Sequence, residues 1–292
     1  MAKDGDKMSE KETVLHQLPK GGGSDCYTPE NIVAGLKTEK IGRTVFCYDI
    51  VDSTNEEAKR QALKGAPSGS LFLAEQQTCG KGRLGRSWVS PPGTGMWFSV
   101  LLRPEVLPRN IAATTLLAGT AVCGAVREVT GCDVKIKWPN DIVAGTRKIS
   151  GILTEMNVTK GCAEFAVVGI GVNVNSTAFP EELRDKATSI FLETGRPVRR
   201  IALLQEILRR LELLLKENAC GLGASFLEQY KADCVSLGRQ VGFRHGGVLM
   251  TGTAVDISPE GELIVRLPDG SLQTVLSGEV NIQGFYGSSM TP

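Results

Sequence analysis

The stretch Gly80-Lys-Gly-Arg-Leu-Gly-Arg-Ser-Trp88 is the part of the chain around which the rest is organised. It carries three glycines and three cations within nine residues. Glycine lets the backbone turn with positive φ and approach a ligand closely, and arginine presents a planar fork of donors that suits phosphate or carboxylate. Backbone N–H groups in such a turn also form a nest for an anion. We therefore expect an anion-binding loop; the alternative interpretation is a solvated surface hairpin.

The stretch spells G-x-G-x-x-G and nearly matches a P-loop, but its surroundings fit neither nucleotide-binding pattern. The spelling G-x-G-x-x-G indicates a dinucleotide site only where a strand precedes it and a helix follows. Residues 70–77 read as a strand, but Trp88-Val-Ser-Pro-Pro-Gly93 cannot readily start a helix. A P-loop fails for the same reason, and Arg86 stands where that loop needs a lysine. The interpretation that remains is an anion-binding loop between two strands.

The totals of the sequence limit the class of protein. Its 292 residues are 41% hydrophobic and 22% charged, which is ordinary for a globular protein of one large domain or two. The net charge of +1 lacks the basic surplus of a general nucleic-acid binder, so no nucleic-acid partner is expected. No apolar run reaches membrane-spanning length, so no membrane association is expected.

The cysteines and histidines argue against several kinds of site. Eight cysteines and two histidines are present, and no C-x-x-C occurs, so a structural zinc site is disfavoured and no metal ligand can be named. Cys47 and Cys123 lie inside apolar runs, which suits reduced thiols and a cytoplasmic setting. Ser/His/Asp and Cys–His catalysis is disfavoured because His16 and His245 lie outside the core strands.

The hydrophobic pattern predicts an α+β protein in three parts: a flexible tail over residues 1–27, a mixed unit over 28–235 and a small barrel over 236–292. Strands are expected over residues 44–50, 70–77, 96–103, 134–138, 142–144, 148–157, 164–175, 241–244, 248–257, 263–267 and 272–276. Helices are expected from Thr28, from Ser53 to Gly65 with a Ser53–Glu56 capping box, from the cap Asn110 to 130, and over 201–219 and 226–235, whereas 176–200 reads as irregular.

Polar residues and glycines interrupt several of these strands. Gln77 ends one strand, residues 137–141 break another, and residues 147–151 open a third. Gly169 and Gly171 leave one face of a fourth strand clear of side chains, for a ligand or for packing of the helix at 201–219. Because cations and glycines dominate this set, it favours stabilisation of phosphate charge over nucleophilic or acid–base chemistry.

Taken together, the motifs resemble those of biotin–protein ligases, over about residues 28–286. The matching segments are Asp52-Ser-Thr-Asn55, Gln77 with Gly80–Trp88, Lys137-Trp-Pro-Asn-Asp141, Arg147-Lys-Ile-Ser-Gly-Ile152 and Gly169-Ile-Gly-Val-Asn173. The resemblance implies a mixed-sheet catalytic domain of the biotin/lipoate ligase type over 28–235, followed by a small SH3-like β-barrel over 236–292. The resemblance is to the bacterial biotin–protein ligases that lack an N-terminal DNA-binding domain.

The resemblance also implies an activity. Such an ATP-dependent, AMP-forming ligase makes biotinyl-5'-AMP from biotin and ATP, with Mg²⁺, and transfers biotin to a specific lysine of a carrier domain of the acetyl-CoA carboxylase type. Relatives imply a cytoplasmic homodimer. Two alternatives stay open: a lipoate–protein ligase, and a biotin-responsive transcriptional repressor. The near-neutral charge weighs against the repressor, and residues 1–27 are too short for a winged helix–turn–helix.

Roles for individual residues are carried over by position in the motifs. Lys148 and Arg83 are expected to be catalytic. The biotin-binding set is Ser53, Thr54, Gln77, Lys81, Gly82, Arg83, Lys148, Gly151 and Gly169. The ATP or adenylate set is Arg86, Trp88, Asn140, Asp141 and Asn173. The chain departs from the family in two places: Lys81 stands where many relatives have arginine, and residues 176–198 hold no tryptophan that could stack on adenine.

Overall fold

The computed structural model of the chain describes residues 25–104, 111–160, 162–276 and 280–286. Its strands are β1 (Val45–Val51), β2 (Leu71–Gln77), β3 (Gly95–Leu102), β4 (Lys135–Lys137), β5 (Asp141–Ala144), β6 (Arg147–Thr159), β7 (Cys162–Asn173), β8 (Gln240–His245), β9 (Val248–Ile257), β10 (Leu263–Arg266), β11 (Leu272–Val275) and β12 (Asn281–Ile282). Its α-helices are α1 (Pro29–Val33), α2 (Thr54–Leu63), α3 (Ile111–Thr130), α4 (Ile190–Thr194), α5 (Arg200–Glu217) and α6 (Ala224–Asp233), with short 3-10 helices at Arg83–Gly85 and Glu181–Leu183.

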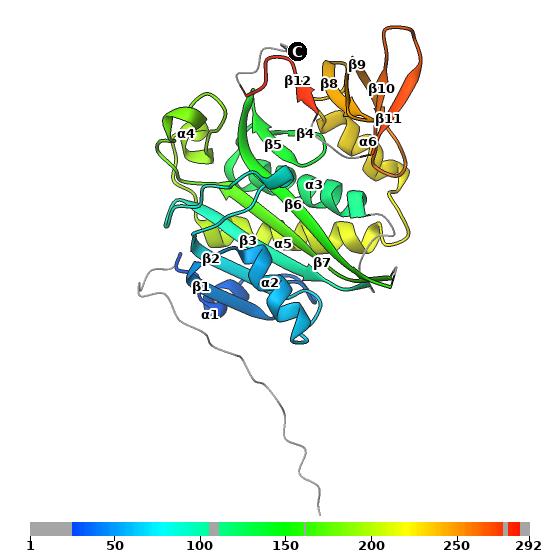
Figure 1. Cartoon of the computed structure of the whole chain (residues 1–292). Coiled ribbons are helices and arrows are strands. Elements are labelled where there is room, and N and C mark those ends of the chain that lie inside the picture. Colours follow the sequence, from blue (N-terminus) through cyan, green and yellow to red (C-terminus); the bar gives the residue numbers. More distant parts are fainter. Residues whose placement is uncertain (1–24, 105–110, 161, 277–279, 287–292) are drawn as a thin grey trace, which may run out of the picture.

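A mixed sheet forms the centre of the molecule (Figure 1). Its seven strands run in the order β1-β2-β3-β7-β6-β5-β4. The pair β1–β2 is parallel and is joined through α2, whereas the other neighbours are antiparallel. Every residue of β3 is buried, because other elements cover both faces of the sheet there. The predicted α+β class with a mixed sheet is confirmed.

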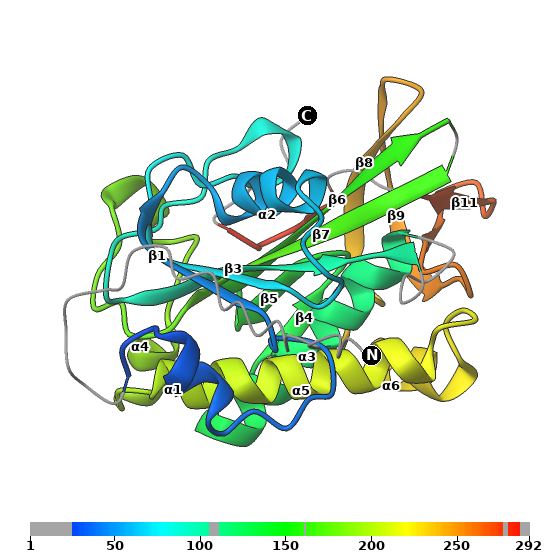
Figure 2. The same ribbon diagram turned by 90° about the horizontal axis from the view of Figure 1, so that it is seen from below.

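Helices cover the two faces of this sheet unequally, as Figure 2 shows from below. The long helices α3 and α5 lie on one face and α2 on the other. The predicted apolar stripe of α5 is buried against the sheet and α3, through Leu204, Ile207, Leu208, Leu211 and Leu215. The smaller core beneath α2 is built from Ala58, Ala62, Phe72, Leu101, Phe165 and Val167.

The packed chain starts before Thr28, where the predicted tail was to end. Tyr27 is buried, and its hydroxyl donates to the Gly95 carbonyl oxygen at 3.2 Å. The Asp25 carboxylate accepts the backbone N–H of Ile201, at the start of α5, at 3.1 Å. Residues 25–27 therefore belong to the fold. The polarity of the local sequence did not predict this, because their partners are distant in the chain. The rest of the predicted tail, and the cap Asn110, lie outside the described residues.

The segment 176–200, expected to be irregular, contains the helix α4. The Ser189 hydroxyl caps it by accepting the Leu192 N–H at 3.1 Å, and Gly195 ends it with φ of 69°. With Ile190 as its buried residue, α4 is too short to show a hydrophobic period in the sequence.

The C-terminal strands form a separate antiparallel sheet in the order β11-β10-β9-β8-β12. The predicted hairpin turn at Asp269-Gly270 joins β10 to β11, and Gly270 has φ of 88°. The small C-terminal β domain is thus confirmed, although β12 was missed because two residues carry no alternation. We propose that the domain boundary lies near residue 236, between α6 and β8.

Two residues of the Lys137–Asp141 motif join this sheet to the rest. Trp138 is buried, and its indole N–H donates to the Gly261 carbonyl oxygen at 3.0 Å. The buried Lys137 ammonium donates to the Val280 carbonyl oxygen, also at 3.0 Å. These two side chains thus hold the C-terminal domain, while Asn140 and Asp141 turn towards the pocket described below.

A buried carboxylate on α5 fixes the chain that enters β1. Glu212 accepts the backbone N–H groups of Glu39 and Lys40 at 2.7 Å and that of Ile41 at 2.9 Å. We expect Glu212→Ala to lower the free energy of unfolding by about 2–3 kcal/mol, because these donors lose a charged acceptor. The exposed Glu228→Ala should stay within about 0.5 kcal/mol of the wild type in the same urea titrations.

The effect of Glu212→Ala should also depend on pH. Burial raises the pKa of Glu212, but the backbone N–H donors outweigh it and the net pKa is lowered. A lowered folded-state pKa stabilises the fold above the unfolded-state pKa of about 4.3, and this contribution is lost as the pH falls through the folded-state value. The difference between variant and wild type should therefore shrink below about pH 4. A difference that is absent at pH 7 would contradict this assignment.

Candidate active site

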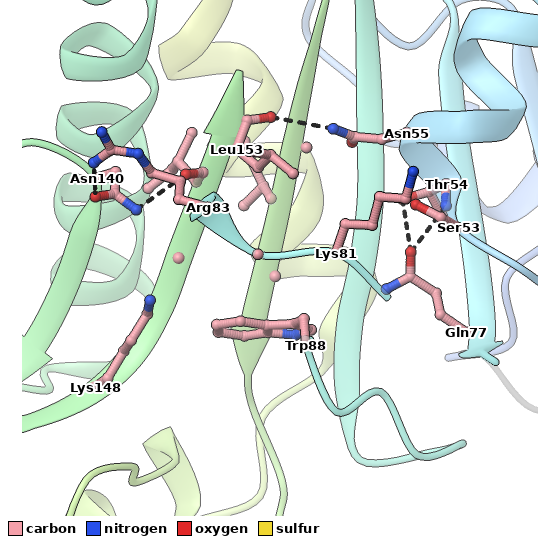
Figure 3. Close-up of a pocket in the computed structure, with 16 residues that line it drawn as sticks. Ser53, Thr54, Asn55, Gln77, Lys81, Arg83, Trp88, Asn140, Lys148 and Leu153 are labelled. Carbon is pink, nitrogen blue, oxygen red and sulfur yellow. Dashed lines mark hydrogen bonds between the residues drawn. The ribbon is translucent and has the colours of Figure 1, made fainter. Parts of the chain in front are cut away.

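A pocket opens at the start of α2, between the 78–90 loop and the strands β6 and β7 (Figure 3). Its walls enclose about 430 Å³, the open mouth included. It is lined by Ser53, Thr54, Asn55, Gln77, Lys81, Gly82, Arg83, Trp88, Asn140, Lys148, Gly151, Ile152, Leu153, Gly169, Ile170 and Gly171. Segments far apart in the sequence therefore meet in this one place.

Gln77 organises the α2 end of the pocket. Its side-chain oxygen accepts the Thr54 N–H at 2.8 Å and lies 3.2 Å from the Thr54 hydroxyl, while its amide nitrogen donates to the Ser90 hydroxyl at 2.8 Å. Ser53 occupies the cap position of α2 but its side chain makes no capping hydrogen bond, so the predicted Ser53–Glu56 capping box is wrong. Gln77 accepts the N–H of the first helical residue, Thr54, and the Ser53 hydroxyl lines the pocket.

The glycine face of β7 is covered by pocket side chains. A Cβ on Gly169 would lie 2.0 Å from the Asn55 side-chain oxygen, and one on Gly171 would lie 2.5 Å from the Trp88 indole. These close approaches require glycine. The alternative, that these glycines admit the helix α5, is wrong, because that helix lies on the opposite face of the sheet.

Asn55 and Ser99 are site residues that the sequence analysis left out. The Ser99 hydroxyl lies 2.6 Å from the Asn55 oxygen and 2.8 Å from the Thr54 hydroxyl. The Asn55 amide donates to a Glu155 carboxylate oxygen at 2.7 Å and to the Leu153 carbonyl at 3.3 Å. Two features of the sequence could have indicated these residues: Ser99 is a polar residue in the otherwise apolar β3, and Asn55 ends the 52–55 motif.

The 80–88 loop contains one 3-10 turn and no longer helix, as predicted. Lys81 forms an ion pair with Glu56 at 2.6 Å, and the Arg83 guanidinium donates to the Asn140 side-chain oxygen at 2.7 Å. Hydrogen bonds from Lys59 and Lys81 lower the pKa of Glu56. Protein groups thus already bind two of the loop's cations, which ties Lys81 to α2 and Arg83 to the β4–β5 turn.

Lys148 occupies the opposite end of the pocket. Its ammonium lies 2.5 Å from Asp141 Oδ1 and 5.1 Å from the centre of the Trp88 ring. Its backbone pairs with the 186–188 segment through hydrogen bonds of 2.8 and 2.9 Å. A Cβ on Gly151 would lie 2.9 Å from the Lys148 ammonium, so this glycine gives the lysine room to cross the strand.

Asp141 lies behind Lys148 and holds it. Burial raises the pKa of this carboxyl, but the charges of Lys148 and Lys137 and hydrogen bonds from Lys148 and Tyr286 outweigh burial, so the pKa lies below its ordinary value. Asn140 also donates to Asp141 Oδ1, at 3.1 Å. The carboxylate therefore stays charged and keeps the ammonium directed along the pocket wall.

The pocket brings together most, but not all, of the residues expected from the sequence. Every residue of the biotin set lines it, as do Trp88 and Asn140 of the adenylate set. The others do not: Arg86 is exposed on the loop, Asp141 lies behind Lys148, and Asn173 is buried with its amide donating to the Thr188 carbonyl at 3.1 Å. Gly171, predicted with Gly169 to clear one strand face, also lines the pocket, and further lining residues that were assigned no role are Asn55, Ile152, Leu153 and Ile170.

Metal ligation and membrane-spanning helices were also sought in the described residues. Across the described residues there is no group of three His, Cys, Asp or Glu side chains that could hold a metal ion. None of the helices in those same ranges is both long and apolar enough to cross a membrane.

Comparison with known proteins assigns the family. Residues 47–173 match the Biotin/lipoate A/B protein ligase family, and residues 236–282 match the Biotin protein ligase C terminal domain. The biotin--[acetyl-CoA-carboxylase] ligase of Mycobacterium tuberculosis is 34% identical, over 78% of this chain and 85% of that protein.

The chain belongs to the biotin–protein ligase family.

Other relatives of this biotin–protein ligase agree. The bifunctional ligase/repressor BirA of Bacillus subtilis is 33% identical over 85% of this chain and 77% of that protein. The biotin protein ligase from Aquifex aeolicus, solved in complex with biotin and ATP, is 33% identical with a TM-score of 0.73, and the match covers 82% of this chain and 98% of that one. The chain is thus an enzyme of a family of ATP-dependent ligases.

The glycine face of β7 can be tested directly. We expect Gly169→Ala to expel the Asn55 side chain, because β7 is held between β3 and β6 and cannot move away. Losing these buried hydrogen bonds should cost about 1–3 kcal/mol of stability and abolish the rise in melting temperature that biotin causes. The control is Gly119→Ala in α3, whose new methyl would meet its nearest neighbour at 4.0 Å. A normal biotin-induced shift in folded Gly169→Ala would show that the face does not shape the ligand site.

Proposed function

We propose that this biotin–protein ligase forms biotinyl-5'-AMP from biotin and ATP and transfers the biotinyl group to a lysine of a carrier domain. The observation that carries the proposal is the polarity of the pocket (Figure 3). Hydrogen-bonding groups from Ser53, Thr54 and Gln77 stand at one end, with Lys81 beside them in an ion pair with Glu56. Lys148 and Arg83 stand at the other end, and Trp88 lies between the two ends. Biotin has the same sequence of parts: a polar ureido ring, an apolar chain and a carboxylate.

In the first half-reaction, a biotin carboxylate oxygen attacks the α-phosphorus of ATP. The new oxygen–phosphorus bond forms as the bond to the β-phosphate bridge breaks, and pyrophosphate leaves. Both reactants are anionic, so the barrier includes their mutual repulsion. The Lys148 ammonium and the Arg83 guanidinium lower it by neutralising charge that gathers on the phosphorus and carboxylate oxygens.

In the second half-reaction, the amine of the carrier lysine attacks the acyl carbon of the adenylate. A carbon–nitrogen bond forms, the carbon–oxygen bond to the phosphate breaks, the nitrogen loses a proton and AMP leaves. The charge then develops on the carbonyl oxygen and on the departing phosphate. Both lie beside the position proposed for the first reaction, so Lys148 serves each step without moving far.

The remaining residues support this arrangement. Gly151 and Gly169 give the ligand and its neighbours room along the strands, and Lys81, Gly82 and Arg86 belong to the loop that closes over it. Asp141 acts through Lys148. Asn173 acts through the 186–188 segment, which pairs with the Lys148 backbone. That segment lies within residues 176–198, the proposed counterpart of the adenine-covering segment of relatives.

Magnesium fits this site only as a companion of ATP. Asp141 is the carboxylate that holds Lys148, and Asn140 and Tyr286 also donate to its oxygens. Mg²⁺ commonly keeps several waters and binds substrate phosphates. We therefore assign no protein ligand to it and derive no step from it.

The partners are also proposals. The names of relatives suggest a biotin carrier of the acetyl-CoA carboxylase type. We keep a homodimer as a further proposal. A reducing, cytoplasmic setting is supported by eight cysteines that are all unpaired thiols. The polar end of the pocket favours biotin over lipoate, whose dithiolane ring has no hydrogen-bonding groups, and the assays below include lipoate as the competing substrate.

The charge proposed to drive both steps can be removed. We expect Lys148→Ala to keep its fold and to lose about 10²–10³-fold in biotin-dependent pyrophosphate release, the usual effect of deleting one stabilising donor. The matched control is Lys135→Ala on β4, which removes another strand lysine that pairs with an aspartate, Asp233, at 3.3 Å outside the pocket. Normal release by Lys148→Ala would reject the assigned role, and release that depends on lipoate instead of biotin would reject the proposed substrate.

The loop should close on the ligand. Its ion pair between Lys81 and Glu56 is partly exposed and contributes at most about 1 kcal/mol, so it does not hold the loop firmly by itself. An adenylate would add charge contacts and exclude water from its hydrolysable anhydride. We expect amide hydrogen exchange over residues 80–88 to slow when biotin and ATP are added together, while exchange over β9 stays constant. Equal protection of the loop with and without ligands would refute closure.

A further inference from the structure

The C-terminal segment that follows β12 reaches back to the pocket. The Tyr286 hydroxyl donates to Asp141 Oδ2 at 2.7 Å, while Asp141 Oδ1 faces the Lys148 ammonium at 2.5 Å. We infer that Tyr286 is a positioning residue for the ligation reaction: it fixes the Asp141 carboxylate, and through it the direction of the Lys148 ammonium. The inference rests on the proposed role of Lys148.

Tyr286 is itself held from several sides. Its backbone N–H donates to the Thr146 carbonyl, in the β5–β6 turn, at 3.3 Å. The Lys137 ammonium lies 5.0 Å from the centre of its ring. The preceding Phe285 is buried, beside the Arg239 guanidinium, and anchors the segment in the C-terminal domain. The hydroxyl is therefore delivered to Asp141 by a fixed piece of chain.

The Tyr286 hydroxyl fixes the second oxygen of the Asp141 carboxylate. A carboxylate bound at one oxygen can rotate about its Cβ–Cγ bond and take its ion-pair partner with it. With Lys148 and Asn140 on Oδ1 and Tyr286 on Oδ2, both oxygens of Asp141 are fixed. The charged groups that face this carboxylate are Lys148 on β6 and Lys137 on β4, and Arg83 reaches it through Asn140.

The test is Tyr286→Phe, which keeps the ring under Lys137 and removes the hydroxyl alone. We expect kcat for biotin-dependent pyrophosphate release to fall about 10-fold, the size of effect typical of a lost hydrogen bond to a charged group. Because the phenol lowers the pKa of Asp141, its loss should move the acid limb of the kcat–pH profile to higher pH. A purely structural role of Tyr286 would not shift that limb.

Two further comparisons test whether the effect of Tyr286→Phe passes through Asp141. Tyr48→Phe is the matched control, since it also deletes a hydroxyl bound to a carboxylate, that of Glu57 at 3.2 Å, away from the pocket, and it should leave kcat and the pH profile unchanged. In an Asp141→Asn background, Tyr286→Phe should cause less than about a 2-fold further loss, because its effect passes through the carboxylate.

Three results would overturn the inference: an unchanged kcat in Tyr286→Phe, an unmoved acid limb, or a full additional loss in the Asp141→Asn background. These results differ from failure of the proposed function. If the wild-type protein releases no pyrophosphate in response to biotin, the proposed reaction is wrong. If it does so and Tyr286→Phe behaves as wild type, the positioning role alone is wrong.

Discussion

The ion pair between Lys148 and Asp141, 2.5 Å long, is the interaction on which the rest of the site depends. A lone ammonium at the wall of a narrow pocket would be free to turn towards solvent. Asp141 prevents this, and Asp141 is in turn held by Asn140 and Tyr286. The pair also explains why Gly151 lacks a side chain, since the lysine crosses the strand there. One charge is thus placed by groups from β4–β5, β6 and the C-terminal segment.

At the opposite end of the pocket, hydroxyl and amide side chains are likewise held by hydrogen bonds to their neighbours. Gln77 accepts the Thr54 N–H at the start of α2, and the Ser53 hydroxyl makes no capping hydrogen bond. Ser99 and Glu155 fix the Asn55 amide, which covers Gly169. Thr54, Asn55 and Gln77, which face the pocket, are therefore each held by hydrogen bonds to neighbouring side chains. Such an arrangement keeps the cost of ordering low when a ligand binds, because few rotamers have to be frozen at that moment.

Much of the fold and of the pocket could be predicted from the sequence, because the patterns that mark them lie within short stretches of the chain. Glycine-rich and cationic stretches mark the 80–88 loop, and the spacing of leucines marks α5. The failures come from long-range partners. Tyr27 reads as part of a polar tail but packs against β3, and Ser53 reads as a capping side chain but makes no capping hydrogen bond. Lys137 and Trp138 sit in a motif beside ligand residues, yet they bind the C-terminal domain. Tyr286 carried no pattern at all, because its meaning depends on a carboxylate 145 residues earlier in the chain.

The order in which the pocket is synthesised has a consequence for the cell. The helix start, the loop and the two glycine strands all precede the C-terminal domain in the chain, and Tyr286 comes after every residue that lines the pocket. A nascent chain on the ribosome therefore acquires the walls of the site before it acquires the group that steadies Lys148. Products of interrupted translation would carry an unbraced lysine. If Tyr286 positions Lys148 as inferred above, the ammonium is braced only after the C-terminal segment has been made.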